Sequence, residues 1–303
     1  MSRFWLLVML CLSGILAACT PEKASTYEPK YASNAPPGQI GQEYIFAVHP
    51  LHNPKRLFEV YQPLIELINE RVAPAFHLKL EASRDYAAFE AKLIARKFHI
   101  ALPNPYQTLL SEHHGYRILA KMGSDEQFRG ILIVRRDANI ETFADLKGKA
   151  ISFPAATALA ATMMPRLFLI RHGLVPGDFE ERYVGSQESA IMNVLYGKTT
   201  AAGTWPPPWE ALLRRRPELI NELVVRWETT PLVNNGVVVR NDLRPDDVNA
   251  VKDVLLTLHE HERGRTILKD IEIAKFETAD TSSFETVRQF VAKYDAAFGP
   301  RQP

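Results

Sequence analysis

The sequence predicts an α/β fold, and three observations support this. Short apolar stretches rich in β-branched residues alternate with longer amphipathic stretches from Tyr44 onward, which is typical of helices packed on a largely parallel sheet. A second series of the same kind begins near Gly130. The chain has 303 residues, of which 46% are hydrophobic, so it is large enough to bury one large or two medium cores.

The first series opens with a strand over 44–49 and a helix over 55–71, in which apolar residues recur every three or four positions. The alternation then continues as a strand over 77–82, a helix over 85–97, a strand over 99–102 and a helix over 106–114. These four elements follow the strand and helix spacing of an α/β domain.

The second series contains five expected strands, over 131–135, 150–153, 181–184, 201–205 and 223–228. Between them we expect helices over 142–146, up to the stop at His172-Gly173, over 188–196 and over 209–216. A last strand over 237–240 and two or three helices complete the chain.

The first nineteen residues resemble a bacterial lipoprotein signal. Arg3 precedes an apolar run over 4–12 and the tetrapeptide Leu16-Ala17-Ala18-Cys19, which matches a basic region, a hydrophobic region and a small-residue cleavage site. A buried helix or a membrane span is the alternative, but a span needs about 20 apolar residues. The resemblance implies a signal peptide over 1–18 and acylation of Cys19, for example by palmitate. The protein would then be anchored in the cell membrane or the outer membrane, facing the periplasm or the extracellular space.

The segment 19–42 contains several prolines and no apolar periodicity, so we expect a flexible linker there. The only cysteines are Cys11 and Cys19, so the mature domain has no thiol nucleophile, cysteine metal site or internal disulfide. The 36 basic and 35 acidic residues are balanced, which argues against nucleic acid as a partner. No sequence motif of an enzyme is present, so we expect no catalytic residues, no cofactor and no metal.

A set of short motifs, in a fixed order and spacing, resembles the phosphate/phosphite/phosphonate ABC-transporter substrate-binding proteins. The motifs are Tyr61-Gln62-Pro63-Leu64, Asp85-Tyr86, Pro103-Asn104-Pro105-Tyr106, Gly130 to Arg135, Asp145 to Lys149, His172-Gly173-Leu174 and Gly185-Ser186. Each motif alone is weak, and their order makes the resemblance specific.

The resemblance implies a type 2 periplasmic-binding-protein fold with two lobes, each a mainly parallel sheet flanked by helices. Lobe 1 would comprise 43–124 and 229–303, and lobe 2 would comprise 125–228. A small-molecule ligand would bind in the cleft between the lobes, which close over it by a hinge motion. The implied partners are the permease subunits of an ABC transporter.

The ligand loop departs from the pattern of this family. The family has a Ser-Thr-Ser-Gly run that opens a helix, and alignment on Pro165 places its hydroxyl positions on Ala158, Leu159 and Ala160. Thr157 is then the one remaining hydroxyl, either as an N-cap facing the ligand or as a plain helix cap. Backbone N–H groups at such helix starts still hold an oxyanion.

Gln187 stands where the family has a histidine that meets the phosphonate, so a charge-assisted contact is lost. The side chains left near the predicted cleft are Tyr86, Tyr106, Trp205 and, at the end of the first strand, His49. The aromatic rings either stack on a planar or quaternary ammonium ligand or pack in the core. We therefore expect that the ligand is not a simple phosphonate.

Two functions fit these expectations. The first is a lipid-anchored solute-binding protein of an ABC transporter that takes a small oxyanion such as phosphate or phosphonate, or a related ligand. The alternative is a ligand-sensing or accessory lipoprotein that signals to a membrane partner and holds a non-phosphonate ligand with its aromatic residues. Ligand-binding positions in either case are His49, Tyr86, Tyr106, Thr157, Ala158, Gln187 and Trp205.

Overall fold

The computed structural model describes residues 41–299. The signal peptide, Cys19 and nearly all of the expected linker lie outside this range. Among the described residues, none of the helices combines the length and the apolar character that a membrane crossing requires.

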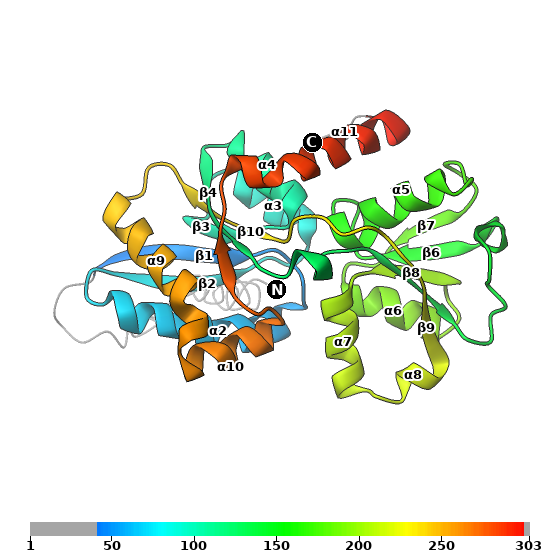
Figure 1. Cartoon of the computed structure of the whole chain (residues 1–303), viewed down its shortest axis with the longest axis horizontal. Coiled ribbons are helices and arrows are strands. Elements are labelled where there is room, and N and C mark those ends of the chain that lie inside the picture. The colour runs from blue at the N-terminus through cyan, green and yellow to red at the C-terminus, as the bar shows by residue number, and fades with distance from the viewer. Residues whose placement is uncertain (1–40, 300–303) are drawn as a thin grey trace, which may run out of the picture. The chain divides into compact units, whose positions relative to one another are not determined.

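The strands between residues 41 and 299 form two sheets, each of which defines a lobe (Figure 1). In lobe 1 the strand order is β11-β4-β10-β3-β1-β2. Its strands are β1 (Gln42–Val48), β2 (Phe76–Ala82), β3 (Ile100–Leu102), β4 (Tyr116–Met122), β10 (Gly236–Arg240) and β11 (Phe276–Thr278). In lobe 2 the order is β7-β6-β8-β5-β9. Its strands are β5 (Ile131–Arg135), β6 (Ala150–Phe153), β7 (Glu180–Tyr183), β8 (Ala201–Thr204) and β9 (Leu223–Glu228).

Helices cover both faces of each sheet (Figure 1). In lobe 1, one apolar cluster packs α2 (Pro54–Val72), α9 (Pro245–Thr257) and α10 (Glu262–Ile271) on one face. A second cluster packs α3 (Tyr86–Ile94), α4 (Pro105–Glu112) and α11 (Glu285–Phe298) on the other. Lobe 2 has α5 (Met164–Arg171) on one face of its sheet and α6 (Gln187–Leu195), α7 (Pro206–Arg215) and α8 (Leu219–Glu222) on the other.

Both sheets are mixed, whereas the sequence led us to expect mainly parallel ones. β1 is parallel to β2 and β3, but β10 is antiparallel to β3 and β4. Likewise β6 is parallel to β7 and β8, but β5 is antiparallel to β8 and β9. β5 and β10 are the strands that the chain enters directly from the other lobe, so they run opposite to their neighbours.

Two chain segments connect the lobes, and they lie side by side. Asn234 Nδ2 donates to the Gly123 carbonyl at 2.9 Å, and the Leu232 N–H donates to the Phe128 carbonyl at 2.9 Å. These bonds link the segment after β4 to the segment after β9. Within residues 41–299 the chain passes between the two sheets only in these two segments.

Elements were missed where the sequence signal is weak. β4 was not expected because its burial is nearly continuous and includes Lys121, which is buried between Asp125 and Glu277 at 2.8 Å from each. β11 has only three residues. The helix expected over 209–216 begins three residues earlier, since Pro206 occupies its first position, where the missing N–H of proline costs nothing.

Helix α11 contacts both lobes. Its first half bonds to α4 in lobe 1, where Arg288 pairs with Glu112 at 2.8 Å. Its last half lies against α5 of lobe 2, where Arg166 donates to the Tyr294 hydroxyl and stacks 4.1 Å from the Phe298 ring centroid. Figure 1 shows this helix running from above α4 toward α5.

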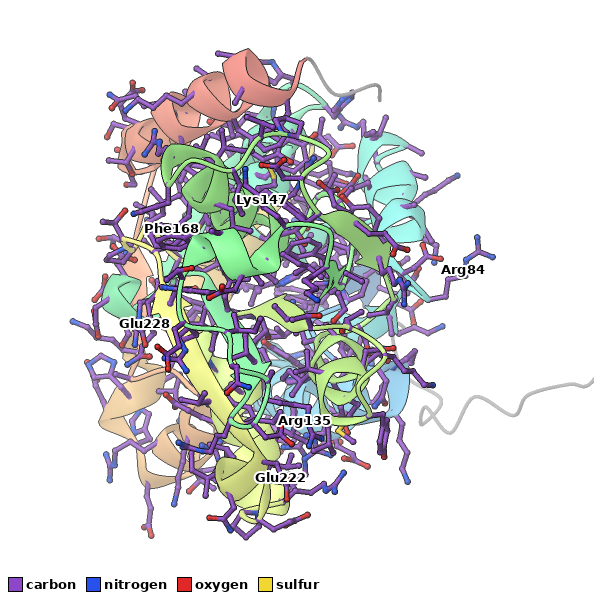
Figure 2. All side chains as sticks on the ribbon, turned by 90° about the vertical axis from the view of Figure 1, so that its right-hand side faces the viewer. Arg84, Arg135, Lys147, Phe168, Glu222 and Glu228 are labelled. Carbon is purple, nitrogen blue, oxygen red and sulfur yellow. The ribbon has the colours of Figure 1, made fainter. Side chains whose placement is uncertain are left out.

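The outer face of lobe 2 carries paired charges. Arg135 of β5 lies near Glu222, at the end of α8, with an N to O distance of 3.9 Å (Figure 2). Arg135 also contacts Asp137 at 2.6 Å. Exposed pairs of this kind contribute little to stability.

Candidate functional site

A small polar cavity lies between the two lobes. Its free volume is about 10 Å³, which is room for about one water molecule, so the lobes are closed over it. It is lined by His49, Tyr86, Asn104, Phe128, Ala158, Leu159, Ala160, Ala161, Gln187, Trp205 and Asn235.

Most of these residues lie where a strand gives way to a helix. His49 directly follows β1, Tyr86 is the first residue of α3, and Asn104 caps α4 after β3. In lobe 2, residues 158–161 follow β6, Gln187 begins α6 and Trp205 links β8 to α7. The carboxyl ends of strands from both sheets therefore meet at one place, which is where α/β proteins usually bind ligands.

The strongest polar feature of the cavity is the start of the helix after β6. This helix begins as a π-helix over Leu159–Met163 and continues as α5. The backbone N–H groups of Leu159, Ala160 and Ala161 have no protein acceptor within residues 41–299, and all three residues are buried. Unpaired N–H groups at a helix start carry partial positive charge and bind anions.

Two glycines let this helix start lie directly on the lobe 2 sheet. A Cβ at Gly203 would clash with the Ala161 carbonyl and would lie 2.6 Å from the Phe153 ring. A Cβ at Gly130 would lie 2.6 Å from the Ala160 carbonyl. Because these carbonyls face the sheet and helix N–H groups point the opposite way, the N–H groups of this turn are left for the cavity.

Three side-chain amides add neutral hydrogen-bonding groups. Gln187 Oε1 accepts from the Thr204 hydroxyl at 2.9 Å, which directs its Nε2 toward the Tyr86 oxygen at 3.5 Å. Asn104 Nδ2 donates to the Thr157 carbonyl at 3.0 Å across the lobes. Asn235 is fully buried and its Oδ1 has no protein partner within the described range, so this group is available to a ligand or a water.

The cavity has no charged side chain among its described lining residues. His49 Nδ1 lies 2.9 Å from the Leu102 carbonyl, to which it donates. Burial lowers the pKa of His49 to about 4, so the ring is neutral at pH 7. Burial also raises the pKa of Tyr86 well above its usual value, so its hydroxyl stays protonated and able to donate.

Helix α7 contributes no donors, although it begins at the same place. Its first three residues are Pro206, Pro207 and Pro208, and proline has no N–H. The aromatic rings beside it pack on one another instead, with Phe128 and Trp205 centroids 5.3 Å apart. The cavity donors contributed by lobe 2 are therefore the N–H groups of Leu159, Ala160 and Ala161 and the amide of Gln187, at the start of α6.

Five of the seven predicted ligand positions line this cavity, namely His49, Tyr86, Ala158, Gln187 and Trp205. Tyr106 does not. It follows Asn104 by two residues on α4, and it lines a separate groove between α4 and α11.

Thr157 is also absent from the cavity lining, and its expected role as a helix N-cap is wrong. Ala158 occupies the N-cap and makes no side-chain bond. The helix starts one residue later than expected because its first turn is π-helical. The loop between β6 and this helix is instead held by the Thr162 hydroxyl, which donates to the Ala155 carbonyl at 2.7 Å.

Sequence reasoning missed several lining residues. Asn104 carries a usable signal, since an asparagine before a proline at a helix start is an N-cap pattern. Phe128 and Asn235 carry none, because they lie in the irregular crossings and not in periodic elements. In the described part of the chain, no group of three or more His, Cys, Asp or Glu side chains is arranged to hold a metal ion.

Two lobes with a polar cavity at the meeting strand ends define a solute-binding protein. Known structures share this fold. A binding protein of a phosphonate ABC transporter from Pseudomonas aeruginosa has a TM-score of 0.78 at 17% identity, covering 85% of this chain and 88% of that one. PhnD1 from Prochlorococcus marinus, solved with methylphosphonate, has a TM-score of 0.77 at 17% identity, with 84% and 98% covered. The aliphatic sulphonate binding protein SsuA from Escherichia coli has a TM-score of 0.56 at 13% identity, with 86% and 94% covered.

Residues 46–284 match the family described as the periplasmic phosphonate substrate-binding protein of ABC transporters. The chain belongs to this family of extracytoplasmic solute-binding proteins, which are not enzymes. The family and the two-lobed α/β fold predicted from the sequence are thus confirmed.

Proposed function

We propose that this protein is the lipid-anchored receptor that binds a small phosphonate or related oxyanion outside the cytoplasmic membrane and delivers it to the permease of an ABC transporter. The observation that carries the proposal is the set of three buried N–H groups at Leu159, Ala160 and Ala161, which have no acceptor within residues 41–299 and belong to residues that line the interlobe cavity. Family membership supports the transport role.

The donor set favours an oxyanion over a cationic ligand. Backbone N–H groups, the Gln187 amide and the Tyr86 hydroxyl all donate, whereas the lining described here holds no carboxylate to balance an ammonium group. A desolvated anion without donors would cost several kcal/mol, and these neutral donors supply that compensation. Loss of the family's hydroxyls and histidine is thereby offset by backbone groups.

We further propose that the lobes, 43–124 with 229–303 and 125–228, open and close about the paired crossings. The cavity is too small for a phosphonate in the present closed arrangement, so binding requires the lobes to separate and then close with the ligand inside. Acylation of Cys19 would anchor the protein at the membrane, close to the permease.

Calorimetry on the full-length protein tests the proposed ligand class. We expect methylphosphonate, phosphite or phosphate to bind and choline, a quaternary ammonium ion, not to bind. Gln187→Leu should weaken oxyanion binding by about tenfold or more, since a hydrogen bond to a charged group contributes roughly 1.5–3 kcal/mol. Gln289→Leu, on an exposed face of α11, is the matched control and should bind normally.

Binding of choline with no response to any oxyanion would contradict the proposal. Equal affinity in Gln187→Leu and wild type would show that the interlobe cavity is not where the oxyanion binds.

A further inference from the structure

A second cavity adjoins the first and shares Gln187 with it. Its free volume is about 30 Å³, roughly the space of two water molecules. Lobe 1 contributes Leu51, His52, Asn53 and Arg56 to its walls, and lobe 2 contributes Ser186, Gln187, Glu188, Pro208, Ala211 and Arg215. Like the first cavity, it exists only while the two lobes are together.

The charges of the second cavity differ from those of the first. Arg56 from lobe 1 and Arg215 from lobe 2 both line it, against the single carboxylate of Glu188. Arg215 bonds to Glu188 at 2.9 Å, and Arg56 bonds to Glu59, outside the lining, at 3.3 Å. Each guanidinium has five N–H donors, so both retain donors for another acceptor.

His52 lines the same cavity as Arg56 and Arg215. Burial lowers the pKa of His52 to about 4, with further lowering from Arg56, His49 and Arg215. Arg56 and Arg215 therefore act on this ring in the same direction, because each positive charge disfavours its protonation.

The N-termini of two helices also lie at the second cavity. Helix α2 begins after its N-cap Asn53, and α6 begins after its N-cap Ser186, and both caps line this cavity. The positive ends of both helix dipoles therefore meet there, one from each lobe. An anion in this position would interact favourably with both lobes at once.

We propose that this second cavity binds an anionic group, a carboxylate or a phosphate, carried by the same solute whose oxyanion occupies the first cavity. The inference rests on the proposed function, because it requires an oxyanion in the first cavity. Gln187 lines both cavities, so the two subsites are neighbours. The proposal requires a short solute with two acidic groups, one for each subsite. The first cavity supplies neutral donors and the second supplies the cationic side chains that the first lacks.

The first test compares methylphosphonate, which has one acidic group, with phosphonoacetate, which has two, by calorimetry on the full-length protein. Phosphonoacetate should bind about tenfold more tightly, as expected for an added hydrogen bond to a charged group. Arg56→Gln and Arg215→Gln should each reduce that advantage without weakening methylphosphonate. The control Arg216→Gln removes an arginine one residue along, which pairs with Glu218 at 2.9 Å and does not line the cavity, so it should keep the advantage.

Equal affinities for the two phosphonates, or an advantage that survives both variants, would overturn the inference. If neither phosphonate binds, the proposed function itself fails, and a second measurement decides the subsite. NMR titration of the His52 ring with acetate or inorganic phosphate should raise its pKa by about one unit in wild type and not in Arg215→Gln. No pKa shift in wild type would exclude an anion subsite. A pKa shift without tighter binding of phosphonoacetate would mean that the second cavity binds a free anion, and it would overturn the proposal that one solute occupies both cavities.

Discussion

Replacing the buried His49 should remove part of the acid sensitivity of the fold. His49 is 2% exposed, and burial lowers its pKa to about 4 from an ordinary value of 6.5. As pH falls below 6.5 the unfolded chain takes up a proton at this position, whereas the folded chain does so only near pH 4. Stability is therefore lost as pH falls from 6.5 to 4, and it is fully present above 6.5.

The size of the effect follows from the two pKa values. At pH 5 the folded state loses about 2 kcal/mol relative to pH 7.5 through His49 alone, on a scale of 1.36 kcal/mol per pKa unit. For a domain of this size, that corresponds to roughly 4–8 °C in melting temperature. His49→Gln retains an amide that can donate to the Leu102 carbonyl and has no group that titrates in this range.

The assay is thermal unfolding at pH 7.5 and pH 5.0 of wild type, His49→Gln and His77→Gln. His77 is exposed on β2, so its variant should lose as much stability as wild type between the two pH values. His49→Gln should lose about 2 kcal/mol less, whatever its stability at pH 7.5. The same loss in His49→Gln and wild type would refute the reasoning.

Three further predictions concern the turn, the closed state and the anchor. Gly203→Ala should lower the free energy of unfolding by about 1–3 kcal/mol through overpacking and weaken methylphosphonate binding. The control Gly197→Ala, strained at φ +67° with nothing within 4 Å of its Cβ, should lose stability but bind normally. Calorimetry measures binding and thermal unfolding measures stability, and intact binding in Gly203→Ala would exclude the turn from the site. Arg214→Gln removes the interlobe ion pair with Glu272 and should increase the radius of gyration of the ligand-free protein in small-angle scattering; an unchanged profile would show that this pair does not hold the lobes together. Cys19→Ser should release a folded protein from the membrane fraction, and its retention there would refute lipid anchoring.

Most of the fold was accessible from the sequence because its strands and helices are periodic. The strand β9 was predicted at its observed bounds, Leu223–Glu228, and α2 within one residue at each end. The direction of β5 and β10 was not accessible, because local periodicity carries no information on which strands become neighbours. The strand β4 was not predicted either, because its sequence contains Lys121. This lysine is buried through ion pairs that form only in the folded chain.

The site was predictable only in part, for a related reason. Residues at the junctions of strands and helices, such as Gln187 and Trp205, could be placed from element order. Tyr106 was misplaced because two residues of helix rotate a side chain by about 200°, which directs it toward α11 instead of the cavity. The N–H groups of residues 159–161 depend on a π-helical turn, and no residue pattern in this stretch specifies one.

The position of α11 affects how affinity should be understood in this protein. Because this helix contacts α4 in lobe 1 and, through Arg166, Tyr294 and Phe298, α5 in lobe 2, its contacts stabilise the closed arrangement without any solute. The apparent dissociation constant equals the intrinsic constant divided by the fraction of molecules already competent to bind. Under the proposed opening and closing of the lobes, contacts that stabilise the closed state make opening less frequent, which slows both the association and the dissociation of the solute. We therefore expect side chains on α11, which do not line the interlobe cavity, to affect the rates of capture and release.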